Sequence, residues 1–434
     1  MEGKAQTQNV SELEAIDQTN IWHPFTQAKT APSPIPIVRG EGCYLVAADG
    51  TRYLDAISSW WVNIHGHANS YIANKIADQA MTLEHVMFAD FTHAPACELA
   101  KRLLKHLPGN LSRIFYCTTG STAVETALKI SIQYWYNKGH PRTKVVAFKK
   151  GYHGDTVGAM STSARGLFTK PFEPLLFDLI TIDPPAFGQE EISANQLRQA
   201  LADNDVACFF YEPQVQGASG MHIHSKEGLD DLIAICKAHG VLAIADEVMT
   251  GFGRTGPLFV SNTLKNKPDI ICLSKSLTAG YLPMAATICT EELFQAFLSD
   301  DLARALLHGH TYAGNPIGCA AALASLDLLE DPACERQRAM IEHQHKLFQA
   351  RILNHPHIKR CEVVGTILIV EYHDDSKGSY YSPFRDRLAR FFLDNYVHLR
   401  PFGNMIHVMP PYCIVEDDLQ LIYTVIERSL KELF

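Results

Sequence analysis

Residues 241–280 read VLAIADEVMTGFGRTGPLFVSNTLKNKPDIICLSKSLTAG and contain two short apolar runs, each followed at once by an ionisable side chain. The run VLAIAD ends at Asp246, and the run IICLS is followed by Lys275. Short runs that are apolar throughout and bounded by turn residues are typical of strands buried on both faces of a sheet. Because open α/β sheets bind ligands at the carboxyl ends of their strands, the stretch predicts a carboxylate and an amine at a ligand-binding edge.

The same pattern extends outward, as further apolar runs that alternate with helical segments. Strands are predicted at RIFYCT (113–118), KVVAF (144–148), VACFFYE (206–212) and MAATICT (284–290). Helices are predicted over about 121–137 and over 229–239. Buried strands separated by helices predict an α/β fold with a mostly parallel sheet. We expect residues 65–330 to form this large domain.

The two ends of the chain have a different pattern, and we expect residues 1–64 and 331–434 to form one smaller α+β domain together. The N-terminal part shows hairpin-like alternation around Asp49-Gly50 and is too short for a large core of its own. Helices are predicted near 335–353, 383–396 and 416–432, with a pair of short strands around Gly365 and short runs at VHLRPF and MIHVMPP.

The composition excludes several classes of protein. Of the 434 residues, 47% are hydrophobic and 20% charged, which is enough to bury a core, and the formal net charge of -9 argues against nucleic-acid or anionic-membrane partners. The 11 cysteines include no Cys-x-x-Cys pair, so we expect reduced thiols and neither a disulfide framework nor a zinc ribbon. The N-terminal residues carry acids and no apolar core, so no signal peptide is expected and the protein is expected to be cytoplasmic.

Two motif matches carry little weight in this context. GFGRTG (251–256) fits the dinucleotide fingerprint G-x-G-x-x-G, but Pro257 follows where the fingerprint requires a helix to begin. We expect instead a glycine loop that lets the backbone pass close to another group. His-x-His pairs begin at residues 65, 308, 343 and 355, and without an identified third ligand they do not predict a metal site.

Two segments at strand ends could hold a phosphorylated ring. TTGST (118–122) joins a predicted strand to a helix, so Gly120 and Ser121 can present backbone N–H groups to a phosphate, although the segment taken alone is more typical of an ordinary capped helix start. Tyr152, in KKGYHGDT (149–156), could stack on a planar ring or merely pack on the sheet.

Asp246 and Lys275 complete the set, although each alone could be a capping carboxylate or a lysine that reaches solvent. A lysine that emerges from a buried strand can be desolvated, which lowers its pKa and makes it a nucleophile toward carbonyls. A phosphate cradle, an aromatic face, an acid and an amine are the groups that pyridoxal 5′-phosphate requires, so the sequence predicts an enzyme with this cofactor.

The chain resembles the fold-type I, class III aminotransferases over essentially its whole length. The resemblance rests on YEPQVQGASG (211–220), IADEVMTGFGRTG (244–256), PDIICLSKSLTAG (268–280) and HGHTYAGNPIGCAAA (308–322). Further segments resemble the members that aminate 8-amino-7-oxononanoate in biotin biosynthesis: IWHPFTQ (21–27), SSWWVNIHGH (58–67), HVMFADFTHAP (85–95), QYWYNKG (133–139), GYHGDTVGAMS (151–161) and LRPFGNMIHVMPPY (399–412). The resemblance implies ping-pong transamination that yields 7,8-diaminononanoate.

The resemblance also implies a role for each matched residue at the cofactor. Lys275 is similar to the Schiff-base lysine and Asp246 to the partner of the pyridinium nitrogen. Gly120 and Ser121 are similar to the main phosphate contacts, and Tyr152 to the residue over the ring.

Residues of the substrate pocket and of the subunit interface carry over in the same way. His310 and Thr311, preceded by Gly309, are similar to residues that reach the cofactor phosphate of the neighbouring subunit, which implies a homodimer with sites at the interface. The resemblance implies that Trp60 and Trp61 shape the substrate pocket. We expect Arg400 to bind the far carboxylate of the keto substrate. Lys275, Tyr152 and Gly309 are expected to contact substrate as well.

One residue departs from the family pattern and bears on the amino donor. Phe25 stands where well-known users of S-adenosylmethionine have a tyrosine, and some relatives that use lysine have phenylalanine here. The paired tryptophans resemble the S-adenosylmethionine users, so this donor is expected, with lysine as the alternative. Another ω-aminotransferase activity, on a diamine or an ω-amino acid, is the other alternative. Glu212 and Arg254 are expected near the pocket without an assigned role.

Overall fold

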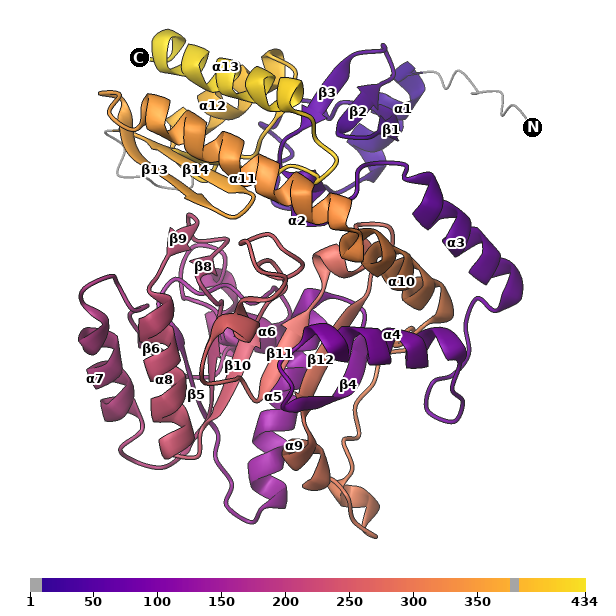
Figure 1. Cartoon of the computed structure of the whole chain (residues 1–434), viewed down its shortest axis with the longest axis vertical. Helices are drawn as coiled ribbons and strands as arrows, with labels where there is room; N and C mark the ends of the chain where they lie inside the picture. Colours follow the sequence, from indigo (N-terminus) through magenta and orange to yellow (C-terminus); the bar gives the residue numbers. More distant parts are fainter. Residues whose placement is uncertain (1–9, 375–381) are drawn as a thin grey trace.

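The computed structural model describes residues 10–374 and 382–434, and its centre is a seven-stranded sheet (Figure 1). The strand order is β4 (Leu111–Cys117), β12 (Ala285–Thr290), β11 (Ile270–Leu273), β10 (Leu242–Asp246), β7 (Val206–Tyr211), β5 (Lys144–Phe148) and β6 (Leu179–Ile182). The pairs β10–β11, β10–β7, β5–β7 and β5–β6 are parallel, whereas β12 is antiparallel to both of its neighbours. The predicted mostly parallel α/β sheet is confirmed, and β6 is an additional edge strand that the sequence patterns did not predict.

Helices cover both faces of this sheet, because alternate residues of each strand belong to different hydrophobic clusters. In β5, Val146 and Phe148 join one cluster, and Val145 and Ala147 join the other. The second cluster contains α5 (Gly120–Asn137), which packs across β12, β11, β4 and β7. The first contains residues of α4 (Ala94–His106), α7 (Glu190–Ala200), α8 (Lys226–Ala238) and α10 (Pro316–Glu330). Because each face of the sheet packs against helices, both the odd and the even positions of a central strand are buried, and this explains why its sequence is apolar without alternation.

The two ends of the chain meet in a separate set of small sheets above the central one (Figure 1). One sheet contains β1 (Ile37–Glu41), β2 (Tyr44–Ala47), β3 (Arg52–Asp55) and β15 (Val397–His398). β2 and β3 form the predicted hairpin, and β15 pairs parallel to β3. The other sheet contains β13 (Ile358–Val364), β14 (Ile367–Tyr372) and β16 (Met405–Val408). The helices of this region are α1 (Val10–Asn20), α11 (Pro332–Ile352), α12 (Pro383–Asp394) and α13 (Glu416–Glu432).

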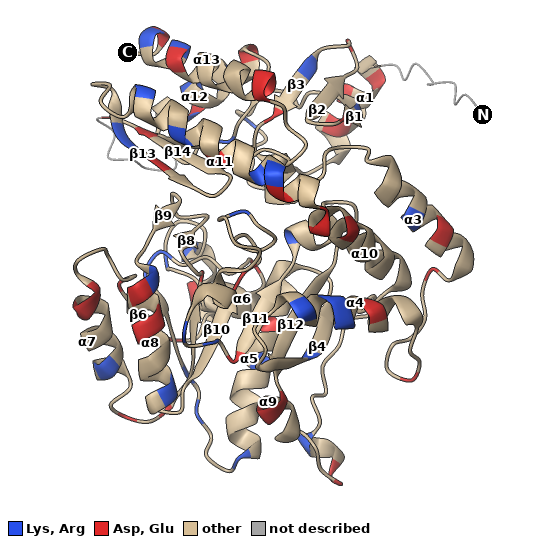
Figure 2. Cartoon of the chain, in the orientation of Figure 1, with Lys and Arg blue, Asp and Glu red and all other residues tan. Residues whose placement is uncertain are grey.

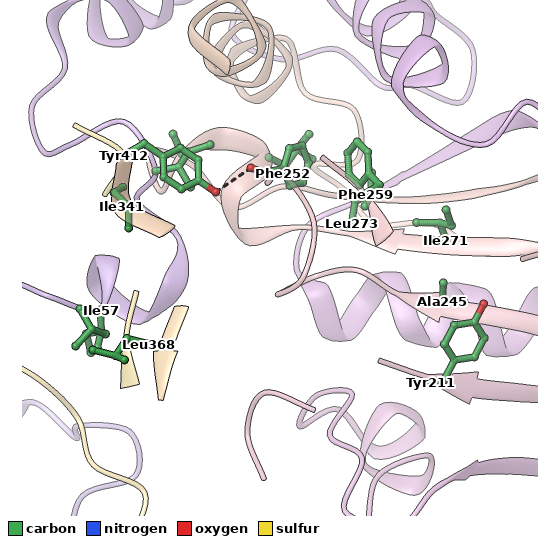
Figure 3. Packing of buried hydrophobic residues seen from close by; sticks show 14 of the residues in the cluster. Ile57, Tyr211, Ala245, Phe252, Phe259, Ile271, Leu273, Ile341, Leu368 and Tyr412 are labelled. Carbon is green, nitrogen blue, oxygen red and sulfur yellow. Dashed lines mark hydrogen bonds between the residues drawn. The ribbon is translucent and has the colours of Figure 1, made fainter. Parts of the chain in front are cut away.

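The remaining elements lie along the chain between the helices and strands named above. They are α2 (Ser58–Trp61), α3 (Ser70–Thr82), α6 (Val157–Ser161), α9 (Glu291–Gln295), the hairpin of β8 (Val215–Gln216) and β9 (His222–Ile223), and the 3₁₀ helices η1 (Lys170–Leu175), η2 (Val260–Thr263), η3 (Lys275–Thr278) and η4 (Leu302–Arg304). One hydrophobic cluster runs from the sheet strands to the terminal elements, with Tyr211 and Ile271 at one end and Leu368 at the other (Figure 3). The glycine loop takes part, since the buried Tyr412 hydroxyl donates a hydrogen bond of 2.9 Å to the carbonyl of Phe252 (Figure 3).

Charged side chains of both signs are interspersed over the outer helices (Figure 2). Within residues 10–374 and 382–434, no helix is both long and apolar enough to cross a membrane.

Candidate active site

A cavity of about 170 Å³ lies at the carboxyl ends of the central strands. It is lined by Trp61, Gly120, Ser121, Tyr152, His153, Gly154, Glu212, Ala218, Asp246, Val248, Met249 and Lys275. Five of the strands contribute, because these residues end or follow β4, β5, β7, β10 and β11. This is the edge at which open α/β sheets bind ligands.

The first turn of α5 forms an anion cradle on one side of the cavity. Thr119 is the N-cap, and its hydroxyl accepts a hydrogen bond of 3.2 Å from the N–H of Thr122. The N–H of Ala123 bonds to the carbonyl of Thr119, so the N–H groups of Gly120 and Ser121 precede the first helical hydrogen bond. Two free N–H groups at the positive end of a helix dipole suit a phosphate.

The carboxylate of Asp246 is buried and held from two sides. One oxygen accepts a 2.7 Å hydrogen bond from Nδ1 of His153, and the other accepts the N–H of Val248 at 3.1 Å. Burial alone would lower the pKa of His153, but the hydrogen bond and charge of Asp246 raise it. The carboxylate is thereby oriented, and its remaining lone pairs can accept a proton-bearing ring nitrogen.

A second carboxylate, that of Glu212, lies beside this pair and follows β7 as Asp246 ends β10. Its two oxygens accept the N–H groups of Tyr152 at 3.1 Å and of Gly217 at 2.8 Å. The pKa of Glu212 is raised to about 7, mainly by burial. The charge of His153 lowers this pKa and the charge of Asp246 raises it. Glu212 therefore fixes the backbone beneath Tyr152 and is partly protonated near neutral pH.

Lys275 enters the cavity from the first residue of η3, directly after β11. Its φ of 45° is in the left-handed region, which non-glycine residues rarely adopt and which is concentrated at functional sites. Its Nζ lies 4.9 Å from the centre of the Trp61 ring. Burial lowers the pKa of the amine, opposed by the charges of Asp246 and Glu212, so a larger share of it is unprotonated than for an exposed lysine.

The two tryptophans come from a turn in which four consecutive residues are left-handed. Ser58, Ser59, Trp60 and Trp61 have φ values of 50°, 45°, 70° and 71°. The buried guanidinium of Arg254 donates to the carbonyl of Trp61 at 3.2 Å, and the Trp61 indole N–H donates to Nε2 of His407 at 2.7 Å. The turn is thus held from outside its own sequence, and it directs Trp61 into the cavity and Trp60 toward solvent.

An aromatic and cationic cluster surrounds Trp60 next to the cavity. The Arg400 guanidinium lies 4.7 Å from the centre of the Trp60 ring, within cation–π range. Phe25 packs edge-on against Trp60 at 5.4 Å and against Phe168 at 5.9 Å between ring centres. Phe25, Trp60 and Phe168 are all substantially exposed, so this cluster forms an open apolar surface with one positive charge.

The segment 309–311 lies elsewhere. Its residues do not line the cavity of their own chain, and His310 packs instead against His308, at 4.9 Å between ring centres. His308 in turn hydrogen-bonds through Nε2 to the Thr126 hydroxyl on the flank of α5. Nε2 of His310 is buried and has no hydrogen-bond partner within the described part of the chain.

The groups that line the cavity fit pyridoxal 5′-phosphate, and two glycines keep the walls beside them closely packed. A Cβ on Gly154 would collide with the Ser121 hydroxyl, and one on Gly120 would lie 2.8 Å from a methyl of Val248. A side chain at either position would therefore displace residues that line the cavity. The cradle, the oriented carboxylate of Asp246 and the amine of Lys275 then face one volume, which is the donor set that this cofactor needs.

The cavity brings together seven of the residues singled out from sequence: Trp61, Gly120, Ser121, Tyr152, Glu212, Asp246 and Lys275. His153, Gly154, Ala218, Val248 and Met249 also line it and were not singled out. A usable signal existed for His153, which follows Tyr152 in the same turn. Glu212 was expected near the pocket without a role, and the rule about strand ends that applies to Asp246 applies to it as well.

Comparison with known families and proteins agrees with this geometry. The family model for aminotransferase class-III matches residues 25–430. A protein of Synechococcus elongatus named adenosylmethionine-8-amino-7-oxononanoate aminotransferase is 45% identical, over 95% of this chain and 99% of its own. A protein of the same name from Geobacter sulfurreducens is 36% identical, over 95% and 96% of the two chains.

Solved structures give the same result. A crystal structure of adenosylmethionine-8-amino-7-oxononanoate aminotransferase from Methanocaldococcus jannaschii matches with a TM-score of 0.92 at 34% identity, covering 98% of this chain and 99% of that one. A PLP-bound amine transaminase from an uncultivated Pseudomonas species matches with a TM-score of 0.87 at 30% identity, covering 95% and 98% of the chains.

Proposed function

The chain belongs to the class III aminotransferases, which depend on pyridoxal 5′-phosphate, and we propose that it transfers an amino group from S-adenosylmethionine to 8-amino-7-oxononanoate, as one step of biotin biosynthesis. The product is 7,8-diaminononanoate. The observation that carries the proposal is the convergence of the Gly120–Ser121 cradle, the Asp246 carboxylate and the Lys275 amine on one cavity. The names of the similar proteins support the choice of substrates.

The residues of this chain divide the work of binding and proton transfer. When bound, pyridoxal 5′-phosphate supplies a ring that withdraws electrons from the substrate carbon. The N–H groups of Gly120 and Ser121 would hold its phosphate, and Asp246, oriented by His153, would keep a proton on the ring nitrogen. The Nζ of Lys275, an amine whose pKa burial lowers, would take a proton from the substrate carbon that bears the amino group and would return it as that group is transferred.

The keto substrate is an apolar chain that ends in a carboxylate, and the cluster at Trp60 has the matching chemistry. Trp60 and Phe25 offer apolar faces, and Arg400 offers two parallel N–H donors for a carboxylate. Tyr152 and Trp61, the sequence neighbour of Trp60, line the cavity itself. Both substrates would use this one pocket in turn.

The donor is tested by separate half-reactions. Purified holoenzyme is mixed with S-adenosylmethionine or with lysine, and the absorbance of the bound cofactor is followed before 8-amino-7-oxononanoate is added. We expect S-adenosylmethionine to be consumed. Reaction with lysine and none with S-adenosylmethionine would show that lysine is the amino donor, which is the alternative that Phe25 suggests. Reaction with a diamine or an ω-amino acid, and none with 8-amino-7-oxononanoate, would indicate another ω-aminotransferase.

The lysine is tested by borohydride reduction of the holoenzyme followed by peptide mapping, which should place a pyridoxyl group on Lys275. The Lys275→Ala variant should lose turnover and keep the wild-type circular dichroism spectrum. A pyridoxyl group on a different lysine, or a fully active Lys275→Ala enzyme, would reject the mechanism.

We further propose a cytoplasmic homodimer in which each chain completes the site of the other. The segment 309–311 lies outside the cavity of its own chain, and Thr311 is exposed. This placement supports a role for Gly309, His310 and Thr311 at the cofactor phosphate of the partner subunit. We also propose that residues 65–330 form the large domain and that 1–64 and 331–434 form the small one, supported by the pairing of β3 with β15.

A further inference from the structure

Two cysteines from opposite ends of the sequence meet at the surface of the region formed by the chain termini. Cys43 lies between β1 and β2, and Cys413 lies between β16 and α13. Their sulfur atoms are 3.5 Å apart. Thiols 370 positions apart in sequence are therefore already in contact, in an arrangement that transamination does not use.

The two thiols differ in their access to solvent. Cys413 is exposed, whereas the side chain of Cys43 is only 4% exposed and lies behind it. Gly66 makes room for the pair, since a Cβ at this position would lie 2.6 Å from the Cys413 sulfur. Cys413 is therefore the residue on the solvent side of the pair, and Cys43 is the partner on the protein side.

The two thiols also differ in pKa, which is lowered for Cys413 and raised for Cys43. The hydrogen bond with Cys43 lowers the pKa of Cys413, against the opposing effects of burial and of the Asp418 carboxylate. The same hydrogen bond, burial, and the charges of Asp418 and Asp55 raise the pKa of Cys43. Asp418 is itself bound by the hydroxyl of Tyr44. A thiolate is the reactive form of cysteine, so the reactive thiol is the one that solvent reaches.

We propose that Cys43 and Cys413 form an oxidation site at which a hydroperoxide produces an intramolecular disulfide. The Cys413 thiolate attacks one oxygen of hydrogen peroxide, which breaks the O–O bond, oxidises the sulfur to a sulfenic acid and releases hydroxide. The Cys43 thiol then attacks the Cys413 sulfur and expels the sulfenic oxygen as water, with its own proton. Two thiols and one peroxide thus yield one disulfide and two waters, and a thiol reductant reverses the change.

The geometry requires only a small movement. The sulfur atoms must approach from 3.5 Å to the disulfide length of about 2.05 Å. Backbone hydrogen bonds anchor both sides, from Asp55 N–H to the Cys43 carbonyl and from Tyr412 N–H to the Ile64 carbonyl, each 2.8 Å long. The bond would link the β1–β2 turn to the segment before α13. A cross-link between such distant positions restricts the unfolded chain, so the oxidised protein should melt at a higher temperature.

The test compares wild-type holoenzyme with Cys413→Ser, Cys43→Ala and the control Cys97→Ser, which removes the other exposed cysteine. Each protein is treated with substoichiometric to modest excess hydrogen peroxide, digested without reduction and mapped by mass spectrometry. Wild type and Cys97→Ser should yield a cross-linked peptide pair containing residues 43 and 413, lighter by two hydrogens than the free peptides. They should also melt about 2 °C or more higher than the reduced protein.

The variants separate the two steps. Cys413→Ser should form no sulfenic acid at Cys43, because the buried thiol is not the attacking one. Cys43→Ala should accumulate a sulfenic acid at Cys413 that dimedone traps. The proposal is overturned if peroxide oxidises Cys97 while residues 43 and 413 stay unlinked in wild type, or if Cys413→Ser consumes peroxide and thiols as the wild type does. Cys413 is exposed, so its serine variant tests the proposal even if Cys43→Ala folds poorly.

Discussion

Replacing Arg254 with methionine should disturb the tryptophan turn more than any other part of the molecule. The guanidinium is fully buried and donates to the carbonyls of Pro410 at 2.9 Å, Trp61 at 3.2 Å and Asn63 at 3.4 Å. Methionine has a similar length and fills much of the same volume, but it provides no donor. The Ser276 hydroxyl, 3.3 Å from the Trp61 carbonyl, still serves that acceptor.

The magnitude follows from the carbonyls of Pro410 and Asn63, for which the described residues offer no side-chain donor besides Arg254. An unsatisfied buried carbonyl costs about 1–3 kcal/mol, so the loss lies at about 2–6 kcal/mol. Burial of the Arg254 charge is itself unfavourable and lowers the pKa of this residue. Methionine removes this cost and so offsets part of the loss, and we expect the free energy of unfolding to fall by about 2–4 kcal/mol. A domain stable by about 5–15 kcal/mol survives this change in the folded state.

The turn itself should yield first. Each non-glycine residue in the left-handed conformation costs about 1–2 kcal/mol, so Ser58–Trp61 holds about 4–8 kcal/mol of unfavourable backbone energy. Without Arg254 this energy is released when the turn unwinds, and both tryptophans then move. Since displacements of about 1 Å at a reacting centre can cost about 100-fold in rate, we expect a raised KM for the keto substrate and a tenfold or greater loss of kcat/KM.

The assay combines urea unfolding with the two half-reactions in wild type, Arg254→Met and Arg254→Lys. Lysine keeps the charge and can serve some of the carbonyls, so this matched control should lie between the other two. Wild-type urea midpoints and wild-type KM values in Arg254→Met would refute the reasoning. A loss of stability with unchanged kinetics would show that the turn does not depend on Arg254.

Three further predictions concern pH, the tryptophan partner and the subunit interface. The pKa of Glu212 is about 7 in the folded chain against 4.5 for an ordinary glutamate, so the stabilisation by its protonated form is complete below pH 4.5 and is lost as the pH rises through 7. The free energy of unfolding of the cofactor-free wild type, measured in urea, should therefore fall by about 3 kcal/mol across this window relative to Glu212→Gln. Parallel pH curves for the two proteins would contradict this prediction. His407→Phe leaves the buried Trp61 indole N–H without an acceptor, which should cost about 1–3 kcal/mol and raise KM, whereas His407→Gln, which keeps an acceptor, should restore KM; equal effects of both variants would count against this role. If His310 serves the partner's site, a mixed dimer of Lys275→Ala and His310→Ala has both substitutions in one site and an intact second site, so it should regain up to half of the wild-type activity. No regain of activity on mixing the two variants would place His310 in its own chain's site.

Most of the central sheet could be predicted because its strands carry their signal locally. A run such as KVVAF (144–148) is apolar at every position after Lys144, and the structure places it as β5 with these same bounds. The positions of Asp246 and Lys275 follow from the same signal, since a polar residue after a buried strand must lie at the sheet's edge. The helix start at Gly120 was equally local, because its cap lies in the neighbouring residue Thr119.

The direction of β12 and the existence of β6 depend on less local information. Between Leu273 and Ala285 the chain has too little length for a helical crossover, which parallel pairing would require, so β12 turns back and runs antiparallel. This could have been inferred from the segment's length and from Pro283. β6, Leu179–Ile182, is a four-residue edge strand with only one buried position, and so little burial leaves no distinctive pattern in the sequence.

The left-handed turn at Ser58–Trp61 could not be predicted from the sequence, and the reason is physical. Positive φ is normally signalled by glycine, yet all four residues carry side chains that disfavour it. The groups that hold the turn come from Arg254, His407 and Met409, the last through its carbonyl to the Ser58 hydroxyl at 2.7 Å. Local preference for side-chain-bearing residues therefore opposes this conformation. The local hydrogen bond from Ser59 to Asp55 is joined by contacts almost 200 to 350 residues away, which the local sequence does not reveal. Because those contacts reach the same tryptophans that face Lys275 and Arg400, the shape of the proposed substrate pocket depends on the packing of both chain ends on the sheet.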